Sequence, residues 1–307
     1  MCEITLDRSE PKVSIIINCF NGARFLKYAI ESVLSQTYRN WELIFWDNQS
    51  TDSSANIFQA YKDARFFYYY AERHTSLGEA RNLAVALSNG DWISFLDCDD
   101  LWSDSKLEIQ MEVVDRDSGG MLGFVYGNTE YFEEGDEKNI YTTLDLSGYK
   151  SLPEGDIFHE LCKSNFVSLV SGLIRRNSFN KVGGFSNKLK QSEDYEIFLK
   201  VSKIFLVGAV NEICCYYRRH ESNLSNSQQE LNFIESIDIL SCFIKDPIVL
   251  KSISLRRGEY IVWALIHSKY SVVLREFSEI SFVDFLASIN DIFLRNIRKK
   301  LYKHYRK

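Results

Sequence analysis

Four short apolar runs within the first hundred residues constrain the fold more than any other feature of this sequence. They occupy residues 13–17, 41–46, 65–70 and 92–96, and they are rich in the β-branched and aromatic side chains of buried strands. Segments with apolar residues at helical spacing lie between them, at 25–36, 53–63 and 78–88. Strands that alternate with helices predict an α/β fold with a mostly parallel sheet covered on both faces.

The rest of the chain shows two further patterns. The middle is less regular, and there we expect an antiparallel strand pair and two helices, at 123–132, 154–163 and 193–201. After about residue 226 the apolar side chains follow helical spacing. We therefore expect three parts, which are residues 1–115, residues 116–225 and a helical C-terminal region at 226–307.

The charge of the chain is unevenly distributed. The net charge of the 307 residues is −6, but residues 295–307 contain seven Lys or Arg and no acid, so the remainder carries −13. An acidic body is a poor binder of nucleic acid, and a short basic tail on it indicates a local anionic partner.

The seven scattered cysteines form no C-x-x-C pair, which favours reduced thiols in the cytoplasm. The polar first twelve residues predict no secretory signal.

Aspartates cluster where the fourth predicted strand ends. Asp97, Asp99 and Asp100 follow the run at 92–96, and Asp47 ends the second strand. Ligands of open α/β sheets bind beyond the carboxyl ends of the strands, where converging carboxylates suit Mg²⁺ or Mn²⁺. The alternative is that Asp99 and Asp100 cap the following helix. We expect Asp100 to cap a helix that opens near Ser103.

Two common classes of nucleotide-binding site are not indicated. No G-x-G-x-x-G follows the first strand, and no G-x-x-x-x-G-K-[ST] occurs in the chain. These absences disfavour a dinucleotide oxidoreductase and a P-loop NTPase. A phosphate-bearing ligand would then be neutralised through a metal held by the aspartates, an arrangement that suits the diphosphate of a nucleotide sugar.

Four blocks of the sequence resemble the family 2 glycosyltransferases. They are residues 13–52, 76–102 with the D-x-D motif "DCD", 181–201 with "QSEDYEIFLK", and 216–225, "YYRRHESNLS". The resemblance implies a GT-A fold, in which residues 1–115 form a nucleotide-sugar-binding half and 116–225 an acceptor-binding half of the same domain. It also implies an inverting, metal-dependent transfer from a nucleotide-diphosphate sugar, for which we expect a UDP-sugar.

The resemblance assigns nucleotide-binding roles to five residues. Phe20 is placed to stack on the base, although a core phenylalanine is the alternative. Asp47 is placed to hold the nucleoside, and Asn48 stands where the family often has a second acid that faces the base. Arg81 is placed to contact the nucleotide, with an ordinary helix-surface arginine as the alternative. Asp97 is placed to approach the ribose.

The metal, phosphate and catalytic roles fall on the other motifs. Asp99 is placed to bind a Mn²⁺ or Mg²⁺ that bridges the two phosphates. The segment at 216–225 adds a candidate metal ligand and two phosphate contacts, which are His220, Arg218 and Arg219. An ordinary hydrogen-bonded histidine is the alternative for the first of these.

Asp194 is the predicted catalytic base, and Glu193 is predicted to orient the acceptor or the base. A base there accepts the acceptor's hydroxyl proton as its oxygen attacks the sugar C1, while the metal stabilises the departing diphosphate. Both acids lie in the first turn of a predicted helix, where the dipole favours acids for structural reasons alone.

The C-terminal tail carries a basic amphipathic pattern. Phe293, Ile297, Leu301 and Tyr305 recur at i, i+4 steps with basic residues between them. The pattern predicts peripheral contact of residues 293–307 with the inner face of the cytoplasmic membrane, which suits a lipid-linked saccharide acceptor in surface polysaccharide assembly. The alternatives are a solvated helix end or a dimer contact.

Two other functions stay open at this point. Sugar nucleotidyltransferases also build metal sites on related sheets, but their Gly-rich basic first loop is absent from "NCFNGARF" at 18–25. A non-catalytic scaffold that binds sugar nucleotides is the other alternative, and the intact Asp97, Asp99 and Asp194 argue against it.

Overall fold

One mixed sheet organises the chain, seen here in a computed structural model that describes residues 12–133, 136–221, 223, 228–290, 292 and 293. Four strands form its parallel half: β1 (Val13–Cys19), β2 (Trp41–Asp47), β3 (Phe66–Tyr70) and β4 (Trp92–Phe95). Their order is β3-β2-β1-β4, with every pair parallel. The predicted alternation of strands and helices is confirmed, and the carboxyl ends of these strands lie along one edge.

The second half of the sheet is mixed. It continues from β4 through β8 (Leu173–Arg175), β6 (Leu122–Glu133), β9 (Leu206–Arg219) and β5 (Leu101–Trp102). Strand β8 is antiparallel to both neighbours, whereas β6 and β9 run parallel. The predicted antiparallel pair around 123–132 is confirmed, because β7 (Asp136–Thr142) pairs antiparallel with β6.

Helices cover both faces of the sheet, so side chains of β1 alternate between two cores. Ile16 packs in one core with α3 (Leu77–Ala86), α6 (Phe158–Lys163) and α8 (Glu193–Ser202). Ile15 and Ile17 pack in the other with α1 (Ala23–Leu34), α2 (Ser54–Gln59) and α4 (Lys106–Arg116). The remaining short helices are α5 (Thr143–Ser147), η1 (Leu169–Ser171) and α7 (Arg176–Lys181).

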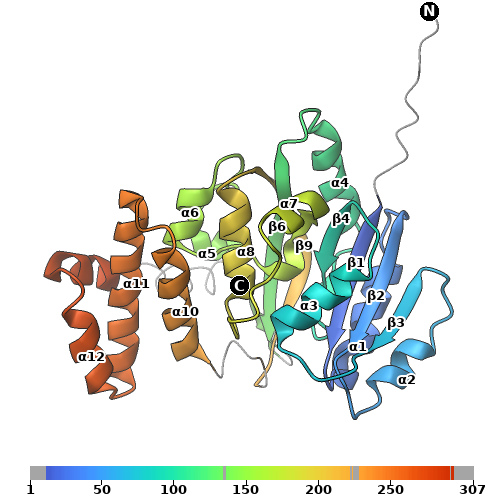
Figure 1. Ribbon diagram of the computed structural model, residues 1–307, viewed down its shortest axis with the longest axis horizontal. Coiled ribbons are helices and arrows are strands. Elements are labelled where there is room, and N and C mark those ends of the chain that lie inside the picture. The colour runs from blue at the N-terminus through green and yellow to red at the C-terminus, as the bar shows by residue number, and fades with distance from the viewer. Residues whose placement is uncertain (1–11, 134–135, 222, 224–227, 291, 294–307) are drawn as a thin grey trace, which may run out of the picture.

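The C-terminal region is helical, as predicted. It contains α10 (Gln229–Ser241), α11 (Pro247–Ile266) and α12 (Tyr270–Phe277), and these helices lie at the opposite end of the molecule from β3 (Figure 1). Side chains of α10 and α11 join the core that contains α8. The division of the chain at residues 115 and 225 stays a prediction.

Asp100 does not cap a helix, contrary to expectation. Residues after it form β5, and α4 begins only at Lys106, after Ser105. Asp100 Oδ1 instead accepts a hydrogen bond from the backbone N–H of Arg218 at 2.8 Å. Pairing of β5 with β9 brings this distant backbone alongside the aspartates, which local sequence patterns do not reveal.

Candidate active site

The loops after β1, β2 and β4 meet at the carboxyl edge of the parallel strands. A Cβ on Gly22, at the start of α1, would lie 2.6 Å from Cys98 Sγ, so only glycine lets the first loop pack this closely on the D-x-D motif. Asp47 ends β2 at the same edge, beside Cys19 of β1. The structure therefore gathers the predicted donor-site residues in one region.

Phe20 belongs to the surface rather than the core. It is 52% exposed, and its ring meets the ring of His74 edge to face with centroids 4.5 Å apart. His74 Nδ1 lies 2.8 Å from the carbonyl oxygen of Asn48, so Nδ1 carries the proton that this bond needs. His74 was missed by the sequence analysis, because nothing in its own segment marks it as a neighbour of Phe20.

Asp47 and Asn48 are buried and bound to other parts of the chain. Asp47 accepts hydrogen bonds from the hydroxyl of Tyr68 at 2.8 Å and from the backbone N–H of Ser50 at 2.7 Å. Burial and this carboxylate raise the pKa of Tyr68. The Asn48 amide donates to the Thr75 carbonyl at 2.9 Å and accepts from the Thr75 N–H at 3.2 Å. Asn48 thereby holds the segment that leads into α3.

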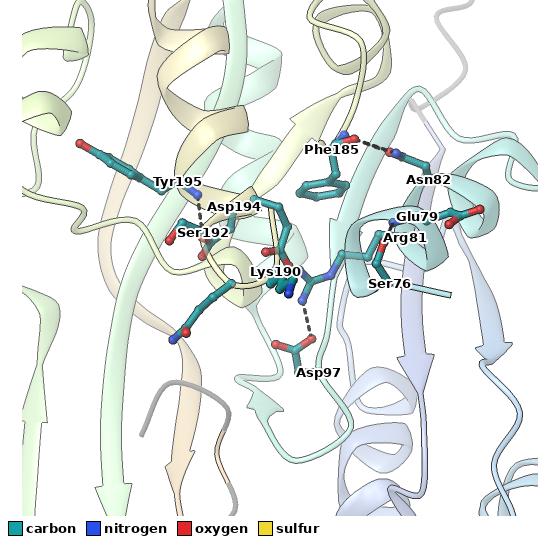
Figure 2. A network of polar contacts seen from close by, with 12 residues as sticks. Ser76, Glu79, Arg81, Asn82, Asp97, Phe185, Lys190, Ser192, Asp194 and Tyr195 are labelled. Atoms are coloured by element: carbon teal, nitrogen blue, oxygen red, sulfur yellow. Dashed lines mark hydrogen bonds and ion pairs between the residues drawn. The ribbon is translucent and has the colours of Figure 1, made fainter. Parts of the chain in front are cut away.

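Arg81 joins two acids that are far apart in the sequence, and Figure 2 shows its contact with one of them, Asp97. Its Nη1 donates to Glu193 Oε1 at 2.6 Å and its Nη2 to Asp97 Oδ1 at 3.0 Å. Arg81 is only 4% exposed, so it is not a helix-surface arginine. Burial alone would lower the pKa of Arg81, but Asp97 and Glu193 raise it above its usual value. We call these three residues the Arg81 bridge.

Asp194 lies beside the Arg81 bridge in the first turn of α8. Burial and the neighbouring Glu193 raise the pKa of Asp194 to about 7, against the opposing effect of Arg81. The backbone N–H of Tyr195 donates to Asp194 Oδ1 at 2.6 Å, which fixes one oxygen (Figure 2). A carboxylate that titrates near neutral pH is suited to accept a proton.

Asp99 and His220 form a second cluster. Asp99 Oδ2 lies 2.9 Å from His220 Nε2, and the Asp99 carbonyl accepts a hydrogen bond from Arg218 Nε at 2.9 Å. Burial and repulsion from Asp97 raise the pKa of Asp99, while His220 opposes them. The adjacent Asp100 has its pKa raised well above the usual range by burial and by the other two aspartates.

The two predicted phosphate contacts lie in different surroundings. The guanidinium of Arg218 lies over the rings of Phe25 and Phe132, at 4.5 and 4.8 Å from their centroids. Arg219 instead donates to the hydroxyl of Tyr141 and lies 3.7 Å from Glu133 Oε1. Arg218, whose Nε donates to the Asp99 carbonyl, is thus bound to the D-x-D segment, whereas the contacts of Arg219 are with the β6–β7 pair.

The donor chemistry of Asp99 and His220 fits part of a Mn²⁺ or Mg²⁺ site. No group of three His, Cys, Asp or Glu side chains suited to holding a metal occurs among the described residues. Asp99 Oδ2 and His220 Nε2 are hydrogen-bond partners at 2.9 Å, so these two donor atoms lie side by side. A carboxylate oxygen and an imidazole nitrogen are both ligands that Mn²⁺ accepts.

Comparison with known proteins places this geometry in a family. The model of the family described as "Glycosyl transferase family 2" matches residues 14–183. The UDP-Glc:alpha-D-GlcNAc-diphosphoundecaprenol beta-1,3-glucosyltransferase WfgD of Escherichia coli is 30% identical over 239 residues, which cover 77% of this chain and 88% of that protein. The E. coli enzyme of the same description named WfaP is 29% identical, over 81% of this chain and 90% of that protein.

Solved structures agree on the fold. The mannosyltransferase PcManGT of Pyrobaculum calidifontis, solved with GDP-Man and Mn²⁺, has a TM-score of 0.62 at 13% identity, covering 98% of this chain and 89% of that one. Residues 1–349 of S. aureus TarS with UDP-GlcNAc have a TM-score of 0.60 at 16% identity, covering 79% and 70%. The predicted GT-A fold is confirmed. The chain belongs to family 2 of the glycosyltransferases, and it is a glycosyltransferase.

Proposed function

We propose that this enzyme moves a hexosyl or N-acetylhexosaminyl group from a UDP-sugar to a hydroxyl of a lipid-linked saccharide, with inversion, in surface polysaccharide assembly. The observation that carries the proposal is Asp194, a carboxyl group with a pKa raised to about 7 beside the D-x-D motif. WfgD and WfaP, which are named as glucosyltransferases that use UDP-Glc and alpha-D-GlcNAc-diphosphoundecaprenol, support the donor and the acceptor class. Family membership favours this transfer over the nucleotidyltransferase and scaffold alternatives.

The residues divide the reaction between them. Phe20 and His74 offer an exposed aromatic surface on which a base can stack. Ionised Asp194 accepts the proton of the acceptor hydroxyl while that oxygen forms a bond to the sugar C1 and the bond from C1 to the diphosphate breaks. Attack from the face opposite the diphosphate inverts the anomeric centre. Glu193 Oε2 is buried without a hydrogen-bond partner in the described part of the chain, which supports a role in orienting the acceptor.

The proposed diphosphate contacts involve the cluster of Asp99 and His220. Asp99 and His220 would hold Mn²⁺ or Mg²⁺, which when bound offsets the negative charge that develops on the diphosphate. Asp97 would approach the ribose, and its hydrogen bond with Arg81, which fixes its orientation, supports this role. Arg218 adds a positive charge next to the D-x-D backbone.

Membrane contact is the remaining part of the proposal. No helix in the described ranges is long and apolar enough to cross a membrane. Residues 282–290 are helical, and large apolar side chains are exposed in this segment at Phe282, Val283, Leu286 and Ile289, and after it at Phe293. The basic tail at 294–307 lies outside the described residues. Exposed apolar residues followed by cations support peripheral binding to the cytoplasmic face of an anionic membrane.

Calorimetry with UDP-, GDP- and dTDP-sugars in the presence of Mn²⁺ tests the donor, followed by transfer to a GlcNAc-diphospholipid. We expect a UDP-sugar to bind, and Asp194→Asn to lower turnover by about 10²- to 10⁴-fold with unchanged donor affinity. Glu196→Gln is the matched control, because Glu196 lies in the same helical turn but pairs with Lys200 at 2.8 Å. Failure of every nucleotide sugar to bind would reject the proposal.

A further inference from the structure

Glu235, on α10 of the C-terminal region, reaches the segment that carries the proposed base. Its carboxylate accepts hydrogen bonds from three consecutive backbone N–H groups, those of Lys190 at 2.7 Å, Gln191 at 3.1 Å and Ser192 at 2.8 Å. Helix α8 begins at the next residue, Glu193, and Asp194 follows it. Glu235 is only 5% exposed, so these bonds are shielded from water.

The physical reason for this contact lies in the start of the helix. Backbone N–H groups at and just before a helix N-terminus have no partners within the helix, and the helix dipole favours a negative charge there. Hydrogen bonds to an ionised acceptor are stronger than neutral ones. A second bond to α10 supports the contact, because Ser192 Oγ donates to Asn232 Oδ1 at 3.3 Å.

The turn that carries Asp194 is therefore held from two sides. Arg81 of α3 binds Glu193 on one side, and Glu235 of α10 binds residues 190–192 on the other. Figure 2 shows Lys190 and Ser192 beside Asp194 in this network. Helix α10 lies outside the residues that the family model matches and outside the four motif blocks.

We propose that Glu235 is a positioning residue, which acts through the backbone of residues 190–192 to hold the Asp194 carboxyl in its buried place beside Arg81. The inference rests on the proposed role of Asp194 as the base. Through this contact, helix α10 supports the active site.

Glu235→Gln tests the proposal, because it replaces one acceptor oxygen with an amide group that faces an N–H donor. We expect turnover to fall by about 10²-fold, as misplacement of a reacting group by about 1 Å can cause, with donor affinity unchanged. We also expect the kinetic pKa of Asp194 to move below about 7, because a looser turn admits water and removes part of the burial effect. A loss of folded protein alone would lower the rate by the same factor at every pH and would leave this pKa unchanged.

Hydrogen exchange of the backbone amides at 190–192 is the second readout, and it does not depend on knowing the donor or the acceptor. Exchange is expected to accelerate in Glu235→Gln and, to a smaller extent, in Glu235→Asp, which keeps both oxygens on a shorter side chain. Asp238→Asn is the matched control, since Asp238 is an exposed carboxylate one turn further along α10.

The two readouts separate the possible failures. Unchanged exchange at 190–192 in both Glu235 variants would overturn the positioning role whatever the enzyme transfers. Accelerated exchange with an unchanged rate and kinetic pKa would overturn the link to catalysis. Accelerated exchange in a protein that binds no nucleotide sugar would leave the Glu235 contact standing and reject the proposed function instead.

Discussion

Arg81 and Glu193 lie 112 residues apart in the sequence, and their side chains meet in a buried ion pair with an N–O distance of 2.6 Å. This pair joins α3, next to the D-x-D motif, to α8, which carries the proposed base. Asp97 accepts the second arm of the same guanidinium. One arginine thus binds both the D-x-D motif and the helix that carries the proposed base.

Removal of Arg81 is expected to destabilise the protein strongly. In Arg81→Met the buried Glu193 carboxylate loses its partner, so the free energy of unfolding should fall by about 3–5 kcal/mol. Urea titration measures this change. Arg73→Met is the matched control, because Arg73 pairs with Glu79 but is 72% exposed, and loss of a surface pair costs about 1 kcal/mol or less. Equal effects of both variants would contradict the structural role given to the Arg81 bridge.

Turnover is expected to rise with pH through neutrality. The pKa of Asp194 is raised to about 7, so below that pH the carboxyl is protonated and cannot accept the acceptor's proton. Above it the ionised base is present and the rate should level off. Steady-state rates between about pH 5.5 and 8.5 measure this, with saturating donor. A rate that stays constant down to pH 5.5 would remove Asp194 from the proton transfer.

Asp194→Asn is expected to stabilise the protein at neutral pH although it slows transfer. A carboxyl whose folded pKa is raised binds more protons when folded than when unfolded, so its contribution to stability is lost as pH rises towards about 7. A neutral amide avoids this loss, and we expect a gain on the order of 1–3 kcal/mol at pH 7.5. The gain should shrink at pH 5. Thermal unfolding at the two pH values measures it, and a stability gain that does not depend on pH would contradict the raised pKa.

Metal removal is expected to stop transfer, and loss of the Asp99 carboxylate is expected to raise the Mn²⁺ concentration that restores it. Chelation should abolish turnover and Mn²⁺ should restore it, because the ion offsets charge on the diphosphate. Asp99→Asn removes one anionic ligand and should raise the Mn²⁺ concentration needed for half recovery by about tenfold or more. Asp104→Asn is the control, since Asp104 is exposed and accepts from the hydroxyl of Ser35. Equal recovery in both variants would remove Asp99 from the metal site.

Vesicle binding is expected to depend on the end of the chain. The full chain should float with vesicles that contain anionic lipid, whereas a chain that ends at Asn290 should not, because it lacks Phe293 and the seven basic residues after it. Raised salt should weaken the binding of the full chain, since salt screens the attraction between basic side chains and an anionic lipid surface. Uncharged vesicles serve as the control. Equal flotation of both chains would exclude the tail as the membrane contact.

The sequence by itself determined the elements and the chemistry of the motifs. The spacing of apolar residues over a short stretch of sequence distinguishes a strand from a helix. For this reason β1, β2, β4 and the helices between them lie where the pattern predicted. The aspartates of the D-x-D motif follow β4 directly in the sequence. Parallel strands have their carboxyl ends at one edge of the sheet, and ligands bind beyond that edge. Asp194 in the first turn of α8 was also evident from local sequence.

Only the tertiary structure decided which of these residues act on one another. The pairing of Arg81 with Glu193, the meeting of Phe20 with His74 and the contact of Glu235 with residues 190–192 join segments from different elements. Asp100 shows the same point, because its partner is the backbone of Arg218 rather than the following helix. The local spacing of apolar residues does not reveal such partners, because strand order and helix packing bring them together only when the whole sheet forms.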